Sequence, residues 1–242
     1  MLRSILIIVS LTFGYSLGLK AQDKSLAIEK NRVADFLFIT DRKGADPLKA
    51  AYFEDMFPSA QQLGFQRGTA FKIDRPPISG MYYPDFLAIG SWPGNWEQRA
   101  PLFGELSSQK PDIRERRLAI WSSFNMLNFE TQTAIDLQFD SSKIYVFGAY
   151  WKADPKAFSV LKKAFKNEVK QHNGKSTLLI EEAYSMFGYT DAADFLFITE
   201  WESQAAFDAF QNSMHSFKKE QLSNAALRAS SEFYLSVPPK KG

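Results

Sequence analysis

Apolar positions along the chain fall into two kinds of pattern, short continuous runs and longer amphipathic stretches. Two of the longer stretches space their apolar residues three or four positions apart: Phe158, Leu161, Phe165 and Val169 in one, and Phe207, Phe210, Met214 and Phe217 in the other. This spacing puts one apolar stripe on a helix. Pro155 precedes the first stripe at a position suited to a first helical turn. We therefore predict helices over 155–171 and 203–217.

The short apolar runs, bounded by turn residues, predict strands. In the second half of the chain these strands cover 144–151, 177–187, 195–201 and 232–237. The first half gives strands at 36–40, 64–73, 86–92 and 117–129, with helices at 47–57 and 95–106. Pro101 lies inside the last of these helices, which is therefore expected to break or to begin there. The order in each half is βαββαβ, the ferredoxin-like unit.

A seven-residue sequence, ADFLFIT, occurs twice, at Ala34–Thr40 and at Ala193–Thr199. A longer match aligns Asp85–Trp92 with Asp194–Trp201 at an offset of 109 residues. The same offset carries Phe36 of the first half onto Tyr145, inside another apolar run. A period of this length is too long for a solenoid and suits a duplicated domain.

The predicted strands are continuous apolar runs rather than clean alternations, which is typical of sheets covered on both faces. A four-stranded sheet with helices on one face leaves its other face bare. Two such sheets packed face to face would cover both. The apolar content of 45% and the 22 Phe residues supply material for this core. We therefore expect an intramolecular pseudo-dimer, in which one chain acts as a monomer.

The first 21 residues have the pattern of a secretory signal peptide. Arg3 supplies the positive start, Ile5–Leu19 is apolar but short for a membrane span, and Leu19-Lys20-Ala21 is an acceptable cleavage site. We expect export to the periplasm or the extracellular space, with an uncleaved anchor as the alternative. The other expected boundaries are a polar spacer at 22–32, a first unit at 33–130, a linker at 131–141, a second unit at 142–238 and a tail at 239–242.

Charge and composition argue against several classes of function. Loss of Arg3 and Lys20 with the signal would reduce the 29 basic residues to 27, equal to the 27 acidic ones. We therefore expect no nucleic-acid partner and, after cleavage, no membrane partner. The absence of cysteine excludes a thiol nucleophile, a disulfide and a Cys-based metal site. His172 and His215 fall on expected polar surfaces, and no phosphate-binding glycine loop occurs, so we expect no metal and no cofactor.

A few side chains could carry acid–base chemistry. Glu181 and Glu182 follow an apolar run, and adjacent strand residues face opposite sides, so one of the two would point inward. A carboxylate in an apolar cavity would have a raised pKa and could act as a general base. The alternative is a strand end in water. Tyr184 and His215 complete the candidate catalytic set.

Aromatic residues near the ends of the predicted strands form a second candidate set. Trp92 and Trp201 occupy equivalent positions, Trp151 ends another strand, and Phe210 lies on the last predicted helix. Such residues usually close a core. As a group they could also line a pocket for a flat apolar ligand.

The stretch from Glu200 to Lys218, EWESQAAFDAFQNSMHSFK, resembles the third-strand and second-helix signature of the antibiotic biosynthesis monooxygenase family. That family belongs to the dimeric α/β-barrel superfamily, whose subunits are ferredoxin-like. The resemblance implies an α+β fold in which two tandem ferredoxin-like units form an intramolecular dimeric α/β-barrel. The haem-degrading branch of the family carries a Trp and a His on this helix, where this chain has Phe210 and Glu220. The resemblance therefore argues against that haem site.

Three hypotheses follow for the function. The resemblance, together with the expected signal peptide, implies an exported, monooxygenase-like enzyme that acts on an apolar aromatic small molecule without metal or flavin. Trp201, Tyr184, Glu182 and His215 would be the residues to test. The alternatives are a non-catalytic module that binds a small apolar ligand and a structural domain without a ligand. The lack of a buried His, a Cys or a recognisable triad favours these two alternatives.

Overall fold

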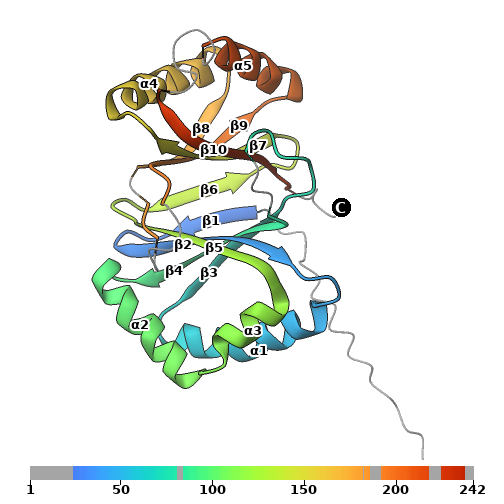
Figure 1. Ribbon diagram of the computed structural model, residues 1–242, viewed down its shortest axis with the longest axis vertical. Coiled ribbons are helices and arrows are strands. Elements are labelled where there is room, and N and C mark those ends of the chain that lie inside the picture. Colours follow the sequence, from blue (N-terminus) through green and yellow to red (C-terminus); the bar gives the residue numbers. More distant parts are fainter. Residues whose placement is uncertain (1–23, 81–83, 182, 186–191, 218–224, 238–242) are drawn as a thin grey trace, which may run out of the picture.

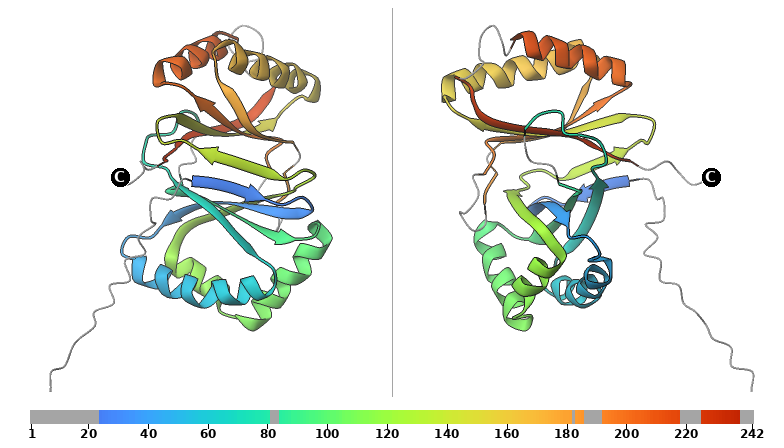
Figure 2. Two further views of the ribbon diagram at one scale, coloured as in Figure 1. Left: turned by 180° about the vertical axis from the view of Figure 1, so that it is seen from behind. Right: turned by 45° about the vertical axis from the view of Figure 1, so that its right-hand side comes forward.

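The computed structural model describes residues 24–80, 84–181, 183–185, 192–217 and 225–237 of the 242-residue chain. Two antiparallel four-stranded sheets face each other across the middle of the molecule, and helices cover the outer face of each sheet (Figure 1). The views from behind and from the side show the same order of layers (Figure 2). Among the described residues, no helix combines the length and the apolar character needed to cross a membrane.

The first unit is built on the sheet β3-β4-β2-β5. Its strands are β2 (Arg32–Asp41), β3 (Gln66–Lys72), β4 (Phe86–Pro93) and β5 (Trp121–Glu130). Its helices are α1 (Asp46–Gln62), α2 (Trp96–Gln109) and α3 (Ile113–Ile120).

The second unit is built on the sheet β10-β7-β9-β8. Its strands are β7 (Ile144–Lys152), β8 (Lys175–Glu181), β9 (Phe195–Trp201) and β10 (Leu227–Leu235). Its helices are α4 (Pro155–Gln171) and α5 (Gln204–Phe217). In both units the strands lie in the spatial order fourth, first, third, second, which is the ferredoxin-like arrangement. The predicted α+β fold of two ferredoxin-like units is confirmed.

Backbone bridges join the two sheets into one barrel. Lys72 at the end of β3 pairs with Ser236 just beyond β10, and Asn128 on β5 pairs with Tyr184 beyond β8. In the second bridge the Asn128 N–H donates to the Tyr184 carbonyl at 2.9 Å, and the Tyr184 N–H donates back at 2.6 Å. These edges of the first sheet therefore find hydrogen-bond partners in the second unit, which protects them from pairing with other chains.

Strand pairing shows which residues of the two units correspond. Phe36 lies opposite Ile89 in the first sheet, and Phe147 lies opposite Ile198 in the second. Ile89 and Ile198 are related by the 109-residue offset, so strand pairing makes Phe36 correspond to Phe147. The prediction that the offset carries Phe36 onto Tyr145 is therefore wrong. The correction is two residues, which leaves every side chain on the same face of its strand. A pattern of apolar residues alone does not detect such a shift.

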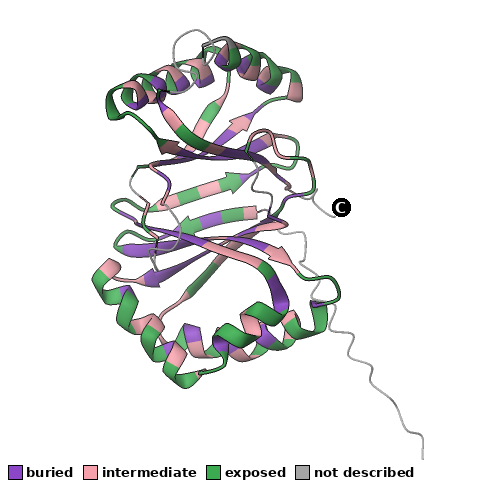
Figure 3. Ribbon diagram, viewed as in Figure 1, coloured by how far each residue is buried: buried purple, intermediate pink, exposed green. Residues whose placement is uncertain are grey.

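Alternation along the strands separates an inter-sheet layer from two helix–sheet layers. On β7, for example, Phe147 and Ala149 are buried between the two sheets, whereas Val146 and Tyr150 are buried under α4 and α5. Buried positions dominate the central strands, and exposed positions follow the outer sides of the helices (Figure 3). Both faces of both sheets are covered, as the continuous apolar runs predicted.

A two-stranded ribbon lies between the sheets, formed by β1 (Lys24–Ile28) and β6 (Ile135–Phe139). It falls within the two segments for which the sequence predicts only a polar spacer and a linker. Leu26, Ile28 and Phe139 are buried in the inter-sheet layer. Lys24 Nζ donates to the Ala70 carbonyl at 2.6 Å, and burial lowers the pKa of this amine to about 8. The ribbon is thus part of the core rather than a tether.

Two local predictions in the first unit are wrong. Helix α2 runs through Pro101 without a break, and a capping box between Asn95 and Gln98 fixes its start. Residues 117–120, predicted as the beginning of a strand, form the last turn of α3. Ile113 and Ile120 of α3 are buried in the helix–sheet layer of this unit. Packing against the rest of the unit, which local pattern does not show, therefore decides the helical conformation.

Candidate functional site

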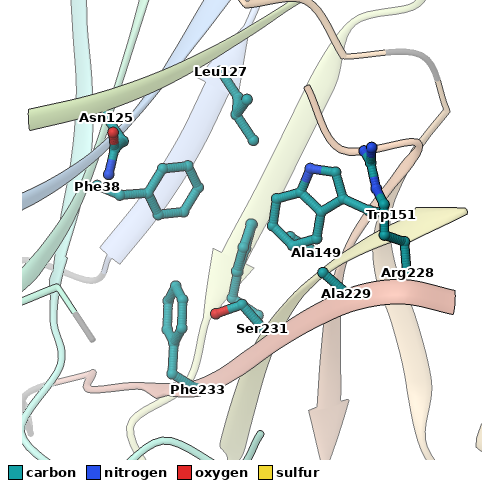
Figure 4. Close-up of a pocket in the computed structure, with 10 residues that line it drawn as sticks. Phe38, Asn125, Leu127, Ala149, Trp151, Arg228, Ala229, Ser231 and Phe233 are labelled. Atoms are coloured by element: carbon teal, nitrogen blue, oxygen red, sulfur yellow. The ribbon is translucent and has the colours of Figure 1, made fainter. Parts of the chain in front are cut away.

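The inter-sheet layer contains a cavity of about 330 Å³ between strands of the two units (Figure 4). Its wall is formed by Phe38 of β2, by Asn125 and Leu127 of β5, by Phe147, Ala149 and Trp151 of β7, and by Arg228, Ala229, Ser231 and Phe233 of β10. No ribbon residue belongs to this wall; the ribbon packs against β3 and near Tyr145 at the start of β7. The cavity therefore requires both units.

Small side chains on β7 and β10 leave the space that becomes the cavity. Ala149 lies opposite Ser231 in the pairing of these strands, and Ala229 lies opposite Trp151. The aromatic residues around them form an apolar wall, in which the Phe147 ring lies 5.3 Å from Phe38 and 5.1 Å from Phe233. Protein interiors contain few voids larger than a water molecule. A cavity of this size, reaching from solvent into a buried layer, is therefore the best candidate for a binding site.

Three polar side chains reach the cavity. Ser231 is buried, and within the described residues its hydroxyl has no hydrogen-bond partner. Asn125 is half-buried, and its amide donates to the Ser123 hydroxyl at 3.4 Å. Arg228 is exposed to solvent. A buried hydroxyl without a partner costs free energy, so Ser231 offers a hydrogen bond to any molecule that enters.

Of the four aromatic residues predicted to bind a ligand, Trp151 lines the cavity and the other three lie outside its wall. Trp201 and Phe210 pack together in the helix–sheet layer of the second unit, with ring centroids 4.7 Å apart. Trp92 is buried in the helix–sheet layer of the first unit. The period of two along a strand turns Trp92 and Trp201 toward the helices. Trp92, Trp201 and Phe210 are therefore core residues, and the prediction that they line a ligand pocket is corrected.

The residues predicted as catalytic are not part of the cavity wall as described. Tyr184 is 43% exposed, and its ring stacks on Trp96 with centroids 5.7 Å apart. His215 is exposed on α5. Glu182 lies outside the described residues. Its neighbour Glu181 accepts a hydrogen bond from Lys162, which lowers the pKa of Glu181 and makes it a poor general base.

A buried ion pair that the sequence did not reveal joins β2 to α2. Arg99 Nε and Nη2 donate to the Asp35 carboxylate at 2.9 and 2.7 Å, and Trp92 Nε1 donates to it at 2.9 Å. Asn128 Nδ2 donates to the same group at 2.5 Å. All four residues are buried. Because four donors occupy this carboxylate, it holds the helix on the sheet.

A second buried polar group lies on the helix-facing side of β10. Tyr150 donates its hydroxyl hydrogen to Glu232, and Gln211 Nε2 donates to the same carboxylate at 3.1 Å. Burial, with the neighbouring carboxylate, raises the pKa of Tyr150 well above its ordinary value. Glu232 thus faces away from the cavity that its neighbour Ser231 lines. Within the described ranges, no cluster of His, Asp or Glu is arranged to hold a metal ion.

Comparison with known proteins supports the fold. No family model matches the chain, and no curated protein matches it. The structure is similar to chlorite dismutase from Candidatus Nitrospira defluvii in complex with imidazole, with a TM-score of 0.50 and 9% identity over 86% of this chain and 92% of that chain. An anthrone oxidase-like protein is also similar, at TM-score 0.46 and 13% identity over 93% and 98% of the two chains. A heme-binding protein from Thermus thermophilus has a TM-score of 0.43 and 10% identity over 90% of this chain and 94% of that chain. At such identities the likeness is one of fold alone.

Proposed function

We propose that this protein binds an apolar aromatic small molecule in the cavity between its two sheets. The observation that carries the proposal is the cavity itself, about 330 Å³ in volume and walled mainly by aromatic and small apolar side chains. Ligand pockets of proteins are mostly apolar, with volumes of roughly 300–1,000 Å³ and a few polar groups that orient the ligand. The Ser231 hydroxyl and the Asn125 amide are suited to that orienting role.

The shape and chemistry of the wall favour a flat ligand of about two fused rings. The cavity volume lies near the lower end of the usual range. Phe38, Phe147 and Phe233 present ring faces and edges, which stabilise an aromatic guest by offset stacking. A hydroxyl or carbonyl oxygen on the guest would accept a hydrogen bond from Ser231 or Asn125.

The direct test is calorimetric titration of the protein with 2-naphthol, alongside variants that fill the cavity. Ala149→Phe places a ring in the empty space and should abolish measurable binding. Ala149→Leu fills less of the space and serves if the larger substitution prevents folding. Ala209→Phe, an exposed position on α5, is the matched control and should bind as the unmodified protein does. Equal binding by a folded Ala149→Phe variant would contradict the proposal.

Oxidation of the bound molecule by oxygen, without metal or flavin, is a second candidate. In its favour, the cavity combines an apolar wall with two hydrogen-bond donors, Ser231 and Asn125, that would stabilise an anionic form of an aromatic substrate. Against it, the described wall includes no carboxylate or imidazole to remove a proton. Oxygen consumption measured with a hydroxylated aromatic such as 2-naphthol distinguishes the two. Binding without consumption leaves a binding module, and consumption lost in Ala149→Phe supports the enzyme.

We further infer that the two units arose by tandem duplication and that the chain acts as a monomeric pseudo-dimer. Corresponding strands, equal strand order and the 109-residue offset support the duplication. The mutual covering of the inner sheet faces supports the monomer, since neither sheet leaves a large apolar face for another chain. Native mass spectrometry should show a single chain, and a dominant dimer would contradict this inference.

A further inference from the structure

A β-bulge on β10 turns Arg228 toward the cavity. Leu227 pairs with Lys152 and Ala229 pairs with Trp151, so β10 advances by two residues where β7 advances by one. Side chains of a regular strand alternate between its two faces. Ala229 and Ser231 face the cavity, so in a regular strand Arg228 would face the helices. With the bulge, Arg228 and Ala229 both line the cavity. Bulges commonly redirect a side chain beside a functional site.

Arg228 lies where the cavity opens to solvent. Arg228 and Ala229 are exposed, whereas Ser231 and Phe233 further along β10 are buried. The guanidinium is drawn beside the Trp151 indole, on the side of the cavity away from Phe38 and Phe233 (Figure 4). The wall therefore changes from apolar and buried to cationic and exposed along a single strand.

We propose that the ligand is an aromatic carboxylate, held with its rings in the cavity and its anionic end on Arg228. This inference rests on the proposed binding function and adds the charge and orientation of the ligand. A guanidinium matches the geometry of a carboxylate and forms paired, charge-assisted hydrogen bonds with it. No acidic residue occurs in the described wall, so no carboxylate of that wall would repel an anionic ligand. The Ser231 hydroxyl remains free to bond an oxygen on the rings.

The test compares 2-naphthoate with 2-naphthamide, a neutral molecule of nearly the same shape, by calorimetric titration. The unmodified protein should bind 2-naphthoate more tightly, and added salt should reduce the difference. Arg228→Gln should weaken 2-naphthoate binding by about 10-fold, as expected for loss of a charge-assisted hydrogen bond, and should leave 2-naphthamide binding within about 2-fold. Arg228→Lys should restore part of the loss. Arg114→Gln, an exposed position on α3, should change neither affinity.

The outcomes separate this inference from the proposed function. If both molecules bind and Arg228→Gln leaves their affinities unchanged, or weakens both equally, the assignment of an anionic ligand is overturned. The cavity would still stand as a binding site. If 2-naphthol binds but 2-naphthoate does not, the inference is overturned and the proposed function stands. If none of the three molecules binds, or if a folded Ala149→Phe variant retains binding, the proposed function and the inference are overturned together.

Discussion

The two faces of strand β7 show how differently the layers of this molecule are packed. On the helix-facing side, the Phe197 ring lies against Gly148 so closely that an added Cβ would come within 1.9 Å of a ring atom. On the opposite side, the neighbouring Ala149 borders a cavity of about 330 Å³. The helix–sheet layer is full, whereas the inter-sheet layer keeps space. A ligand site is therefore expected between the sheets and not under the helices.

The physical basis of this difference lies in the elements that form each layer. Helices can shift along a sheet until their side chains fill its surface. In the layer under α4 and α5, seven Phe and Trp residues fill the space: Phe158, Phe165, Phe207 and Phe210 from the helices, and Phe195, Phe197 and Trp201 from the sheet. The two sheets are held at their edges by backbone bridges, which fix their separation. Where small residues such as Ala149 and Ser231 face across that fixed gap, the space stays open.

The largest expected effect concerns the packed layer. Phe165 contacts four other aromatic rings of that layer, with centroids 4.4 Å from Phe197, 5.7 Å from Phe195, 5.8 Å from Phe210 and 6.1 Å from Tyr150. Phe165→Ala should lower the free energy of unfolding by about 4 kcal/mol, because it removes a large buried side chain from a filled region. Leu127→Ala in the cavity wall should cost only about 2 kcal/mol. Urea unfolding measures both, and equal losses would contradict the difference in packing between the layers.

A smaller effect is expected for the ion pair that holds α2 on the first sheet. Asp35→Ala leaves the Arg99 guanidinium buried without its carboxylate and should lower the free energy of unfolding by about 3 kcal/mol. The double variant Asp35→Ala/Arg99→Met removes the charge as well and should recover part of that loss. Urea unfolding of the two variants checks this. A double variant less stable than Asp35→Ala would show that the pair is not the cause.

The smallest effect is a pH dependence of stability that comes from one buried tyrosine on each face of β7. Burial raises the pKa of Tyr145, in the inter-sheet layer, from 10.0 to about 12, and it raises the pKa of Tyr150 well above 10.0. Since the unfolded chain loses these protons first, their contribution to stability is complete below about pH 10 and is lost as the pH rises toward the folded pKa values. Tyr145→Phe should make that decline shallower and should remove one absorbance change at 295 nm near pH 12. An unchanged decline in urea-unfolding stability between pH 9 and 11.5 would contradict the burial of this hydroxyl.

The sequence was sufficient to predict most of the fold, because the signals for it are local. The apolar stripe through Phe158 and Phe165 predicted α4 with its observed bounds, and the run at 195–201 predicted β9. The ribbon was missed because β1 has only two buried residues, Leu26 and Ile28, and becomes a strand by pairing with β6. Long-range pairing of this kind leaves little trace in a local pattern.

The candidate site was predicted less well, since it depends on contacts between distant segments. Trp151 was the one proposed ligand residue that lines the cavity. The sequence signal that could have located the cavity is a set of small residues at alternate strand positions. These are Ala149 on β7 and Ala229 and Ser231 on β10, and they leave room on a sheet face that is otherwise aromatic. The bulge that redirects Arg228 has no sequence signature, so its role becomes visible only in the structure.

The most direct test of the cavity as a binding site is a crystal structure of the protein with 6-bromo-2-naphthol. The anomalous signal of the bromine atom locates the ligand without assumption about its pose. We expect the bromine between the two sheets, among the aromatic side chains of the cavity wall such as Phe38 and Phe147. A bromine site under the helices or on the outer surface, with the inter-sheet cavity empty, would contradict the assignment of this cavity as the ligand site.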